Sequence, residues 1–262
     1  MNYKYDISIV MSYYNRKYQL TNTLNKFSVL YLNKYKFEVI IVNDGSDELF
    51  NLDNIIDKYD FPIKLINIDK KTKENRINSC ISYNIGFKYT EGKIILIQNP
   101  ECFHVGDILK FVLKYSTKNN YITFSCYNTK NIKLNNLLIH NPKLINNKKF
   151  NILNKKDNTI WYNHPIYRKK YYHFCSAIYK ENLDKIGGFN EKFQYGYEYD
   201  DDELVLKIKR ELKLKMYIIN PTYCFVIHQY HKKDYIKNIS KKILKLKREH
   251  NKKIYDYIFY SK

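Results

Sequence analysis

The chain has 262 residues, of which 44% are hydrophobic and 16% aromatic, and its formal net charge is +20. This composition is typical of a globular protein with its own core and excludes a disordered chain. No apolar run approaches the roughly 18 residues that span a bilayer, and the N-terminus lacks the apolar stretch of a signal peptide, so we expect a cytoplasmic protein. The five cysteines are widely spaced and include no Cys-x-x-Cys pair, which argues against both a disulfide framework and a zinc site.

The positive charge favours an anionic partner, which can be a nucleotide, a nucleic acid or a membrane surface. Part of the excess reflects a general enrichment in Lys, Asn, Ile and Tyr. We therefore predict no specific nucleic-acid partner from the charge alone.

The first half of the chain alternates short apolar segments with segments of helical length. Strands are expected at residues 6–14, 37–44, 63–69, 93–99 and 121–127. Helices are expected between them at residues 17–33, 49–59, 75–89 and 105–118. This alternation predicts an α/β fold with a largely parallel sheet, in which ligands bind at the carboxyl ends of the strands.

The second half is less regular. Residues 130–158 are rich in Asn and Lys and are expected to form an irregular insertion on the acceptor side. Further elements are expected as strands at 173–180, 215–219 and 223–229, a helix near 181–186 and a helix that begins with an acidic run at residue 200.

The C-terminal segment predicts a basic helix. Ile236, Ile239, Ile243 and Leu246 recur at helical spacing among lysines. We favour an apolar stripe packed on the domain with solvated lysines outside. The alternative is peripheral contact of this helix with an anionic membrane.

Four consecutive carboxylates, Asp200-Asp201-Asp202-Glu203, open the acidic helix. Neighbouring like charges repel, so folding alone gains nothing from crowding them. The helix dipole accounts for one or two acids in a first turn, but not for four placed after a glycine-rich approach. We interpret the run as a catalytic or cation-binding site.

Two strand ends indicate a nucleotide site. The first strand leads into Ser12-Tyr13-Tyr14-Asn15-Arg16, and the second ends in Asn43-Asp44-Gly45-Ser46. A carboxylate at this edge can accept hydrogen bonds from a base or a ribose hydroxyl, although Asn-Asp-Gly is also an ordinary turn. The Gly-x-Gly-x-x-Gly fingerprint and the phosphate loop are both missing from the sequence, so hydride transfer and ATP hydrolysis have no support.

Three further groups are candidates for metal or sugar binding. Asn99 and Glu101 follow the fourth strand and offer oxygen ligands for a hard divalent cation. His228 and His231, three residues apart, can complete such a site. Residues 161–164, Trp-Tyr-Asn-His, suit stacking on a sugar and equally suit a buried corner.

The order of these motifs resembles the GT-A glycosyltransferases, especially the inverting enzymes of family 2. The matching segments are residues 9–16, 39–46, 83–86, 95–101, 187–191, 200–204 and 228–231. The resemblance implies an α/β GT-A fold, in which a Rossmann-like mixed sheet flanked by helices merges with an acceptor-binding half. It places a nucleotide-sugar-binding half at 1–128, an acceptor and catalytic half at 129–231, and a basic C-terminal helix at 232–262.

The resemblance also implies roles for individual residues. Donor binding, most often of a UDP-sugar, falls to Tyr13, Asn15, Arg16, Asp44, Asn84 and Asn99. Asp201 becomes the general base and Asp200 contacts the acceptor, with Trp161, His164 and Asp202 as further acceptor-binding residues. Glu101, His228 and His231 hold a divalent metal, Mn²⁺ or Mg²⁺.

One departure from the family concerns the metal. The usual Asp-x-Asp motif reads Asn99-Pro100-Glu101 here, so one carboxylate remains, and either the metal binds more weakly or it depends on the histidines. The implied activity is inverting hexosyl transfer from a UDP-sugar to a hydroxyl of a glycan, protein or lipid acceptor.

Three alternatives stay open. A nucleotidyltransferase needs a glycine-rich loop after the first strand, and residues 12–17 contain no glycine. A catalytically degenerate GT-A fold is suggested by Asn99. A basic nucleic-acid-binding protein predicts salt-dependent affinity and has no use for the acidic run.

Overall fold

The computed structural model describes residues 2–73, 75–146, 161–233 and 236–261. In this part of the chain a seven-stranded sheet has the order β10-β6-β9-β4-β1-β2-β3. Its strands are β1 (Tyr5–Tyr13), β2 (Phe37–Asp44), β3 (Ile63–Ile68), β4 (Gly92–Gln98), β6 (Asn120–Phe124), β9 (Cys175–Tyr179) and β10 (Lys215–Ile219). Neighbouring strands among β1 to β4 pair in parallel, whereas β9 is antiparallel to both β4 and β6. The predicted α/β fold is confirmed, with a mixed sheet.

A second sheet of four strands has the order β5-β11-β7-β8. Its strands are β5 (Cys102–Val105), β7 (Cys126–Asn128), β8 (Trp161–Asn163) and β11 (Phe225–His228). The strand expected at 121–127 divides at Ser125, whose hydroxyl donates to the Ile219 carbonyl at 2.6 Å, and the chain passes there from one sheet to the other. Pairing of β11 with β5 sets His228 opposite Cys102, and therefore beside Glu101.

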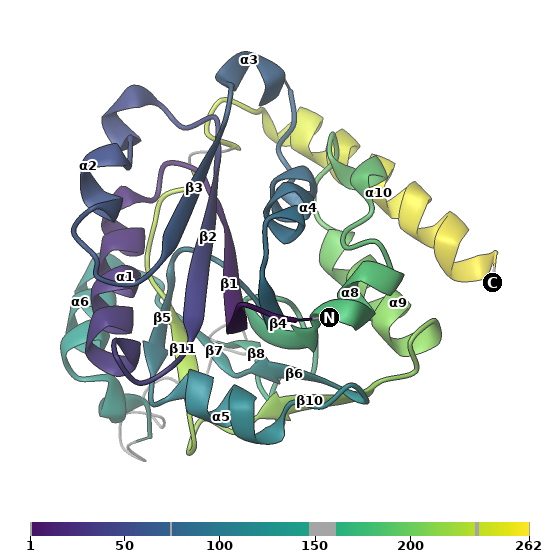
Figure 1. The fold of residues 1–262 in the computed structure, drawn as a ribbon. Coiled ribbons are helices and arrows are strands. Elements are labelled where there is room, and N and C mark those ends of the chain that lie inside the picture. The colour runs from purple at the N-terminus through teal and green to yellow at the C-terminus, as the bar shows by residue number, and fades with distance from the viewer. Residues whose placement is uncertain (1, 74, 147–160, 234–235, 262) are drawn as a thin grey trace.

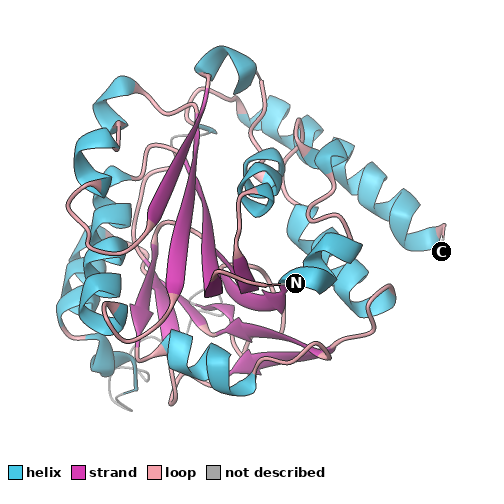
Figure 2. Cartoon of the chain, viewed as in Figure 1, coloured by secondary structure: helices cyan, strands magenta, loops and turns pink. Residues whose placement is uncertain are grey.

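Helices cover both faces of the large sheet (Figures 1 and 2). On one face, α1 (Lys17–Tyr31) and α5 (Ile108–Tyr115) pack on residues such as Ile9 and Met11. On the other face, α4 (Cys80–Lys88), α8 (Lys180–Lys185) and α9 (Asp200–Arg210) pack on residues such as Val10. Because successive strand residues point to opposite faces, a sheet covered on both faces requires the continuous apolar runs seen in the sequence.

Further helices and 3₁₀ turns connect these elements. They are α2 (Asp53–Ile56), α3 (Lys70–Lys73), α6 (Ile132–His140) and the 3₁₀ turns η1 (Glu48–Phe50), η2 (Pro142–Asn146) and η3 (Glu191–Phe193). The prediction of an irregular insertion is therefore wrong for α6, which Asn131 caps by accepting a hydrogen bond from the Leu134 N–H at 2.9 Å. Residues 147–158 of that insertion lie outside the described residues.

Several predicted helices begin later than expected. Residues 102–105 form β5, so the helix expected from residue 105 starts at Ile108, where Asp107 accepts from the Lys110 N–H at 3.0 Å. Similarly, the helix expected at 75–89 starts at Cys80, and the one expected at 49–59 reduces to η1 and α2. The pairing of β5 and the Asp107 cap account for the start of α5, whereas α4 and α2 begin without a side-chain cap.

The C-terminal helix, α10 (Lys241–Tyr260), packs against α9 and η3. It begins after Ser240, which accepts from the Ile243 N–H at 3.2 Å, so the predicted positions 236 and 239 precede it. Ile243 and Leu246 are 48% and 56% exposed, so the prediction that this stripe packs on the domain is wrong for both. Membrane contact through this exposed, lysine-rich face stays a prediction, and co-sedimentation with anionic vesicles would decide it.

No helix in the described ranges combines the length and the apolarity that crossing a bilayer requires.

Candidate active site

A cavity of ≈ 750 Å³ opens at the carboxyl ends of β1, β2 and β4. Because β1 lies between β2 and β4, the strand order reverses there, which is the usual ligand position in such sheets. Asp44, Glu101, Asp201 and His231 all line this one cavity, although they are far apart in the sequence. The structure thus brings together the candidates for donor, metal and base.

Asp44 occupies a buried position at the end of β2, between two cations. Its carboxylate lies 3.1 Å from Lys73 Nζ and 3.7 Å from Arg76 Nη2. Lys73 Nζ also lies 3.3 Å from the centre of the Tyr14 ring. Burial lowers the pKa of Lys73, and the charge of Asp44 opposes that shift. This cluster offers a carboxylate, two cations and an aromatic face to a planar, polar group.

Two of the predicted donor residues serve the scaffold. Tyr13 is fully buried, and its hydroxyl donates to the Phe50 carbonyl at 2.7 Å. Side chains alternate along β1, so Ser12 and Tyr14 point toward the cavity and Tyr13 points away from it. The Asn15 carboxamide donates to Asp47 Oδ2 and accepts from the Asp47 N–H, both at 2.9 Å. It joins the loops that follow β1 and β2.

Asn84 is a third scaffold residue. It donates to the Phe189 carbonyl and accepts from the Phe189 N–H, both at 2.8 Å, and so fastens α4 to the Gly187-Gly188 turn. It does not line the cavity, whereas Arg16 and Asn99 do.

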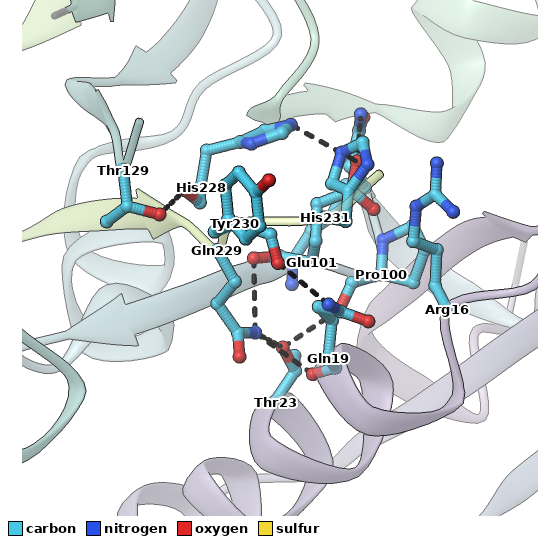
Figure 3. Close-up of polar contacts among 12 residues, drawn as sticks. Arg16, Gln19, Thr23, Pro100, Glu101, Thr129, His228, Gln229, Tyr230 and His231 are labelled. Carbon is cyan, nitrogen blue, oxygen red and sulfur yellow. Dashed lines mark hydrogen bonds and ion pairs between the residues drawn. The ribbon is translucent and has the colours of Figure 1, made fainter. Parts of the chain in front are cut away.

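Glu101, His228 and His231 form a compact group of metal-ligand type, shown in Figure 3. Glu101 Oε1 lies 3.1 Å from His228 Nε2 and 3.3 Å from His231 Nε2. Burial raises the pKa of the Glu101 carboxyl, but the hydrogen bonds and charges of the two histidines outweigh it and hold that pKa well below its usual range. Burial also lowers the pKa of His228, which favours the neutral imidazole that a metal ligand requires. The donor set fits a divalent ion.

Buried hydrogen bonds hold this group in place (Figure 3). Gln229 lies between the two histidines in sequence and is fully buried. Its amide nitrogen donates to the carbonyls of Gln19 at 2.9 Å and Glu101 at 3.2 Å, which ties β11 and the Glu101 loop to α1. On the other side, the Thr129 hydroxyl donates to the His228 carbonyl at 2.9 Å.

The acidic run divides its four carboxylates between two environments. Asp200, Asp201 and Asp202 line the cavity, whereas Glu203 pairs with Lys207 at 3.5 Å on another side of α9. Tyr172 donates its hydroxyl hydrogen to Asp202 Oδ1 at 3.0 Å. Three of the four acids are therefore available to a ligand.

His173 Nδ1 and Asp201 Oδ1 form a hydrogen bond. Burial lowers the pKa of His173, but the adjacent Asp201 carboxylate more than compensates, so this pKa lies above its usual value. The pair leaves the second oxygen of Asp201 for a ligand. Nothing in the sequence joins residues 173 and 201, so the pairing could not be predicted.

The backbone that leads into the acidic helix is strained. Glu198 and Tyr199 have φ values of 62° and 71°, the left-handed region that non-glycine residues rarely adopt. Such strain is retained where the surrounding structure enforces it, and it often accompanies a functional site.

Asp200 should make stability depend on pH. Burial first, and the adjacent Asp201 second, raise the pKa of Asp200 to about 6. A raised folded-state pKa gives a stabilising contribution that is complete below about pH 4 and is lost as the pH rises through about 6. We expect Asp200→Asn to raise the free energy of unfolding by about 1–3 kcal/mol at pH 8 and to change it little at pH 4. Urea denaturation at both pH values measures this, and an equal gain at pH 4 would contradict the charge argument.

The predicted acceptor residues Trp161 and His164 do not line the cavity. Trp161 packs edge-on against Tyr127, and His164 Nδ1 accepts from the N–H groups of Ile166 at 3.1 Å and Tyr167 at 3.2 Å. Burial lowers the pKa of His164 to about 4. Trp161 and His164 therefore match the alternative interpretation of residues 161–164, in which they pack within the domain and do not stack on a sugar.

The neighbouring side chains line the cavity instead. They are Tyr162, Arg168, Lys170, Tyr172, His173 and Phe174. Alternation along β8 would have pointed to Tyr162 once Trp161 was assigned to the core. The other five lie between β8 and β9, where the sequence has no periodic pattern.

The fold and the site define a glycosyltransferase of the GT-A class. A family model, Glycosyl transferase family 2, matches residues 8–184, which is more than half of the chain. The chain therefore belongs to family 2 of the glycosyltransferases. The acidic run lies beyond the matched residues. A search of curated proteins found no match.

Solved structures support the same fold. S. aureus TarS 1-349 is 13% identical with a TM-score of 0.59, covering 86% of this chain and 60% of that one. The same protein in complex with UDP-GlcNAc is 14% identical with a TM-score of 0.58, covering 90% and 61%. The mannosyltransferase PcManGT from Pyrobaculum calidifontis, in complex with GDP-Man and Mn²⁺, is 14% identical with a TM-score of 0.56, covering 89% and 59%. This chain thus spans about three fifths of those chains' length, and at such identities the likeness concerns the fold.

Proposed function

We propose that this protein transfers a sugar from a UDP-sugar to an acceptor hydroxyl with inversion of the anomeric centre. The observation that carries the proposal is one cavity shared by Asp44, the Glu101–His228–His231 group and Asp201. These are the three chemical parts that the reaction needs: a nucleoside site, a site for the diphosphate and its cation, and a base.

The donor nucleoside binds at Asp44 in this proposal. Its carboxylate, held between Lys73 and Arg76, accepts from the N–H of a base or from a ribose hydroxyl. Arg16, which also lines the cavity, adds positive charge for the diphosphate. Among the similar structures, one binds UDP-GlcNAc and another binds GDP-Man, so GDP is the alternative to UDP.

Glu101, His228 and His231 would hold a divalent ion, Mn²⁺ or Mg²⁺. When bound, the ion neutralises the charge that develops on the departing diphosphate. Two imidazole nitrogens with one carboxylate oxygen suit Mn²⁺ better than Mg²⁺, which prefers oxygen ligands.

Asp201 acts as the general base. As the bond from the anomeric carbon to the diphosphate breaks, the acceptor oxygen attacks from the opposite face and Asp201 takes its proton. One base is enough because no glycosyl-enzyme forms, and inversion follows. His173 orients Asp201 through one oxygen and leaves the other for the acceptor, while Asp200 and Asp202 contact the acceptor beside it.

The acceptor is a glycan, a protein or a lipid, bound on the side of Tyr162 and Tyr172. We also propose the cytoplasm as the site of action. All five cysteines are free and buried, which suits a reducing compartment.

Thermal shift with nucleotides tests the proposal first. We expect UDP with Mn²⁺ to raise the melting temperature by several degrees, because a ligand that binds the folded state stabilises it. Asp44→Asn should abolish this shift, and the control Asp57→Asn, at an exposed carboxylate that does not line the cavity, should retain it. Sugar-nucleotide turnover in the presence of candidate acceptors then tests transfer.

The alternative functions predict other outcomes of the same screen. A shift with DNA or RNA alone would support the nucleic-acid-binding protein. No shift with any nucleotide would support a catalytically degenerate fold.

A further inference from the structure

One side chain of α10 is fully buried against the segment that leads into the acidic run. Asn251 has no exposed surface, and its amide nitrogen donates to the carbonyls of Phe193 at 3.2 Å and Glu198 at 2.8 Å. These two carbonyls lie near the ends of the segment 193–198. A single carboxamide therefore fixes the distance across that segment.

Gly196, within the same segment, has no room for a side chain. A Cβ at this position would lie 1.8 Å from Asn251 Oδ1. In the described part of the chain this oxygen is buried and has no hydrogen-bond partner, which is costly for stability. Asn251 therefore packs closely against Gly196 although its Oδ1 gains no hydrogen bond there.

Other contacts join the same segment to α10. The Tyr197 N–H donates to the Lys247 carbonyl at 3.2 Å, and Lys247 Nζ donates to the Tyr195 carbonyl at 2.7 Å. Arg248 pairs with Glu198 at 2.7 Å. Figure 1 shows α10 lying along the side of the molecule that carries α9.

The last residue of the segment, Glu198, and the next residue, Tyr199, are the two left-handed residues, and Asp200 follows directly. Tyr199 occupies the N-cap position of α9 without capping it through its side chain. The helix start therefore does not hold this backbone conformation by itself. The backbone N–H groups of Ile77 and Asn78 donate to the Gln194 carbonyl at 3.3 Å, earlier in the segment. Glu198 itself is contacted from α10, by Asn251 and Arg248.

We propose that Asn251 is a positioning residue, which holds the left-handed turn in place and thereby sets Asp200, Asp201 and Asp202 in the cavity. The C-terminal helix is then part of the catalytic unit and not an appended basic tail. This inference deepens the proposed function and rests on it for the role of Asp201.

The first test is Asn251→Ala, with Asn238→Ala as the matched control because Asn238 is exposed and lies before α10. We expect kcat to fall roughly 10- to 100-fold, the loss typical of a misplacement of about 1 Å, with UDP affinity unchanged. Hydrogen exchange at residues 197–202 should accelerate. The control should match the wild type in all three measurements.

Asn251→Asp separates hydrogen bonding from space filling. Aspartate keeps the shape but sets a carboxylate oxygen against two carbonyl oxygens. We therefore expect it to lose at least as much kcat as alanine. A higher kcat for aspartate than for alanine would show that Asn251 only fills space, and would overturn the proposal.

A double variant tests the contact from the other side. Gly196→Ala should lower kcat and accelerate exchange because its methyl group meets Asn251. In combination with Asn251→Ala, it should do no further harm, since the colliding atoms are gone. Independent, additive losses would contradict the proposed contact.

Exchange distinguishes failure of this inference from failure of the proposed function. If exchange is faster in Asn251→Ala but the wild type makes no product, the positioning role of Asn251 is supported and the proposed transferase activity is overturned. If the wild type is active and the variant has the same kcat and the same exchange rates as the wild type, only the positioning role of Asn251 is overturned. If the Asn251 variants do not fold, hydrogen exchange in the wild type is the deciding measurement. The Tyr197 amide must then be as protected as the amides of α10. Much faster exchange at Tyr197 would refute the positioning role of Asn251.

Discussion

Asp201→Asn should lower kcat by about 10²–10⁴-fold, the range that general-base catalysis contributes, while UDP affinity stays within about twofold. Asparagine keeps the shape of the side chain, and its oxygen can still accept from His173 Nδ1. It cannot take up the proton of an acceptor hydroxyl. The proposed nucleoside site at Asp44 lies on another element and should not change. Steady-state kinetics with calorimetric titration of UDP measures both quantities.

The acidic run provides its own control for this experiment. Glu203 lies two residues from Asp201, but its carboxylate pairs with Lys207 and does not line the cavity. Glu203→Gln should therefore keep kcat within a few-fold of the wild type. Unimpaired turnover in Asp201→Asn, or an equal loss in Glu203→Gln, would refute Asp201 as the base.

The sequence was informative where a residue's role depends on its position along a strand. Buried strands require apolar runs, and a parallel sheet gathers strand ends at one edge, so Asp44 and Glu101 could be assigned to one site. The acidic run could be singled out because its charge repulsion has no structural benefit, and three of its four carboxylates line the cavity. In these cases the position of a residue along the sequence is enough to predict where it lies in the fold.

The sequence was misleading where the direction of a side chain decides. Tyr13 and Trp161 stand one residue from cavity-lining side chains, and a motif match does not distinguish the two faces of a strand. Asn84 follows the family pattern but anchors a turn.

Pairings between distant segments were beyond sequence analysis. The His173–Asp201 hydrogen bond and the Asn251 contacts with residues 193–198 arise only when separate elements pack together. No local periodicity encodes such pairings. In the proposed function they are also the contacts that orient the catalytic carboxylates.

Loss of the metal group should have the second large effect. We expect Glu101→Gln to weaken Mn²⁺ binding by more than about 100-fold, since changes outside the ligand set already cost about 10–100-fold, and to lower kcat/KM at limiting metal to a similar extent. The carboxylate contacts both imidazoles, and an amide removes its charge and one acceptor oxygen. Addition of a chelator should bring the wild type down to the level of the variant. Calorimetric titration with Mn²⁺ and Mg²⁺ measures the affinities.

Asn99→Asp gives the opposite change at the same site. Asn99 Nδ2 lies 3.5 Å from Glu101 Oε1, so aspartate there would restore a second carboxylate to the motif. An additional oxygen ligand should raise affinity for Mg²⁺ more than for Mn²⁺, because Mg²⁺ depends more on oxygen donors. The ratio of the two affinities therefore reports whether the histidines set the preference for Mn²⁺. Equal Mn²⁺ and Mg²⁺ affinities in the wild type, unaltered by Asn99→Asp, would show that the histidines take no part in metal binding.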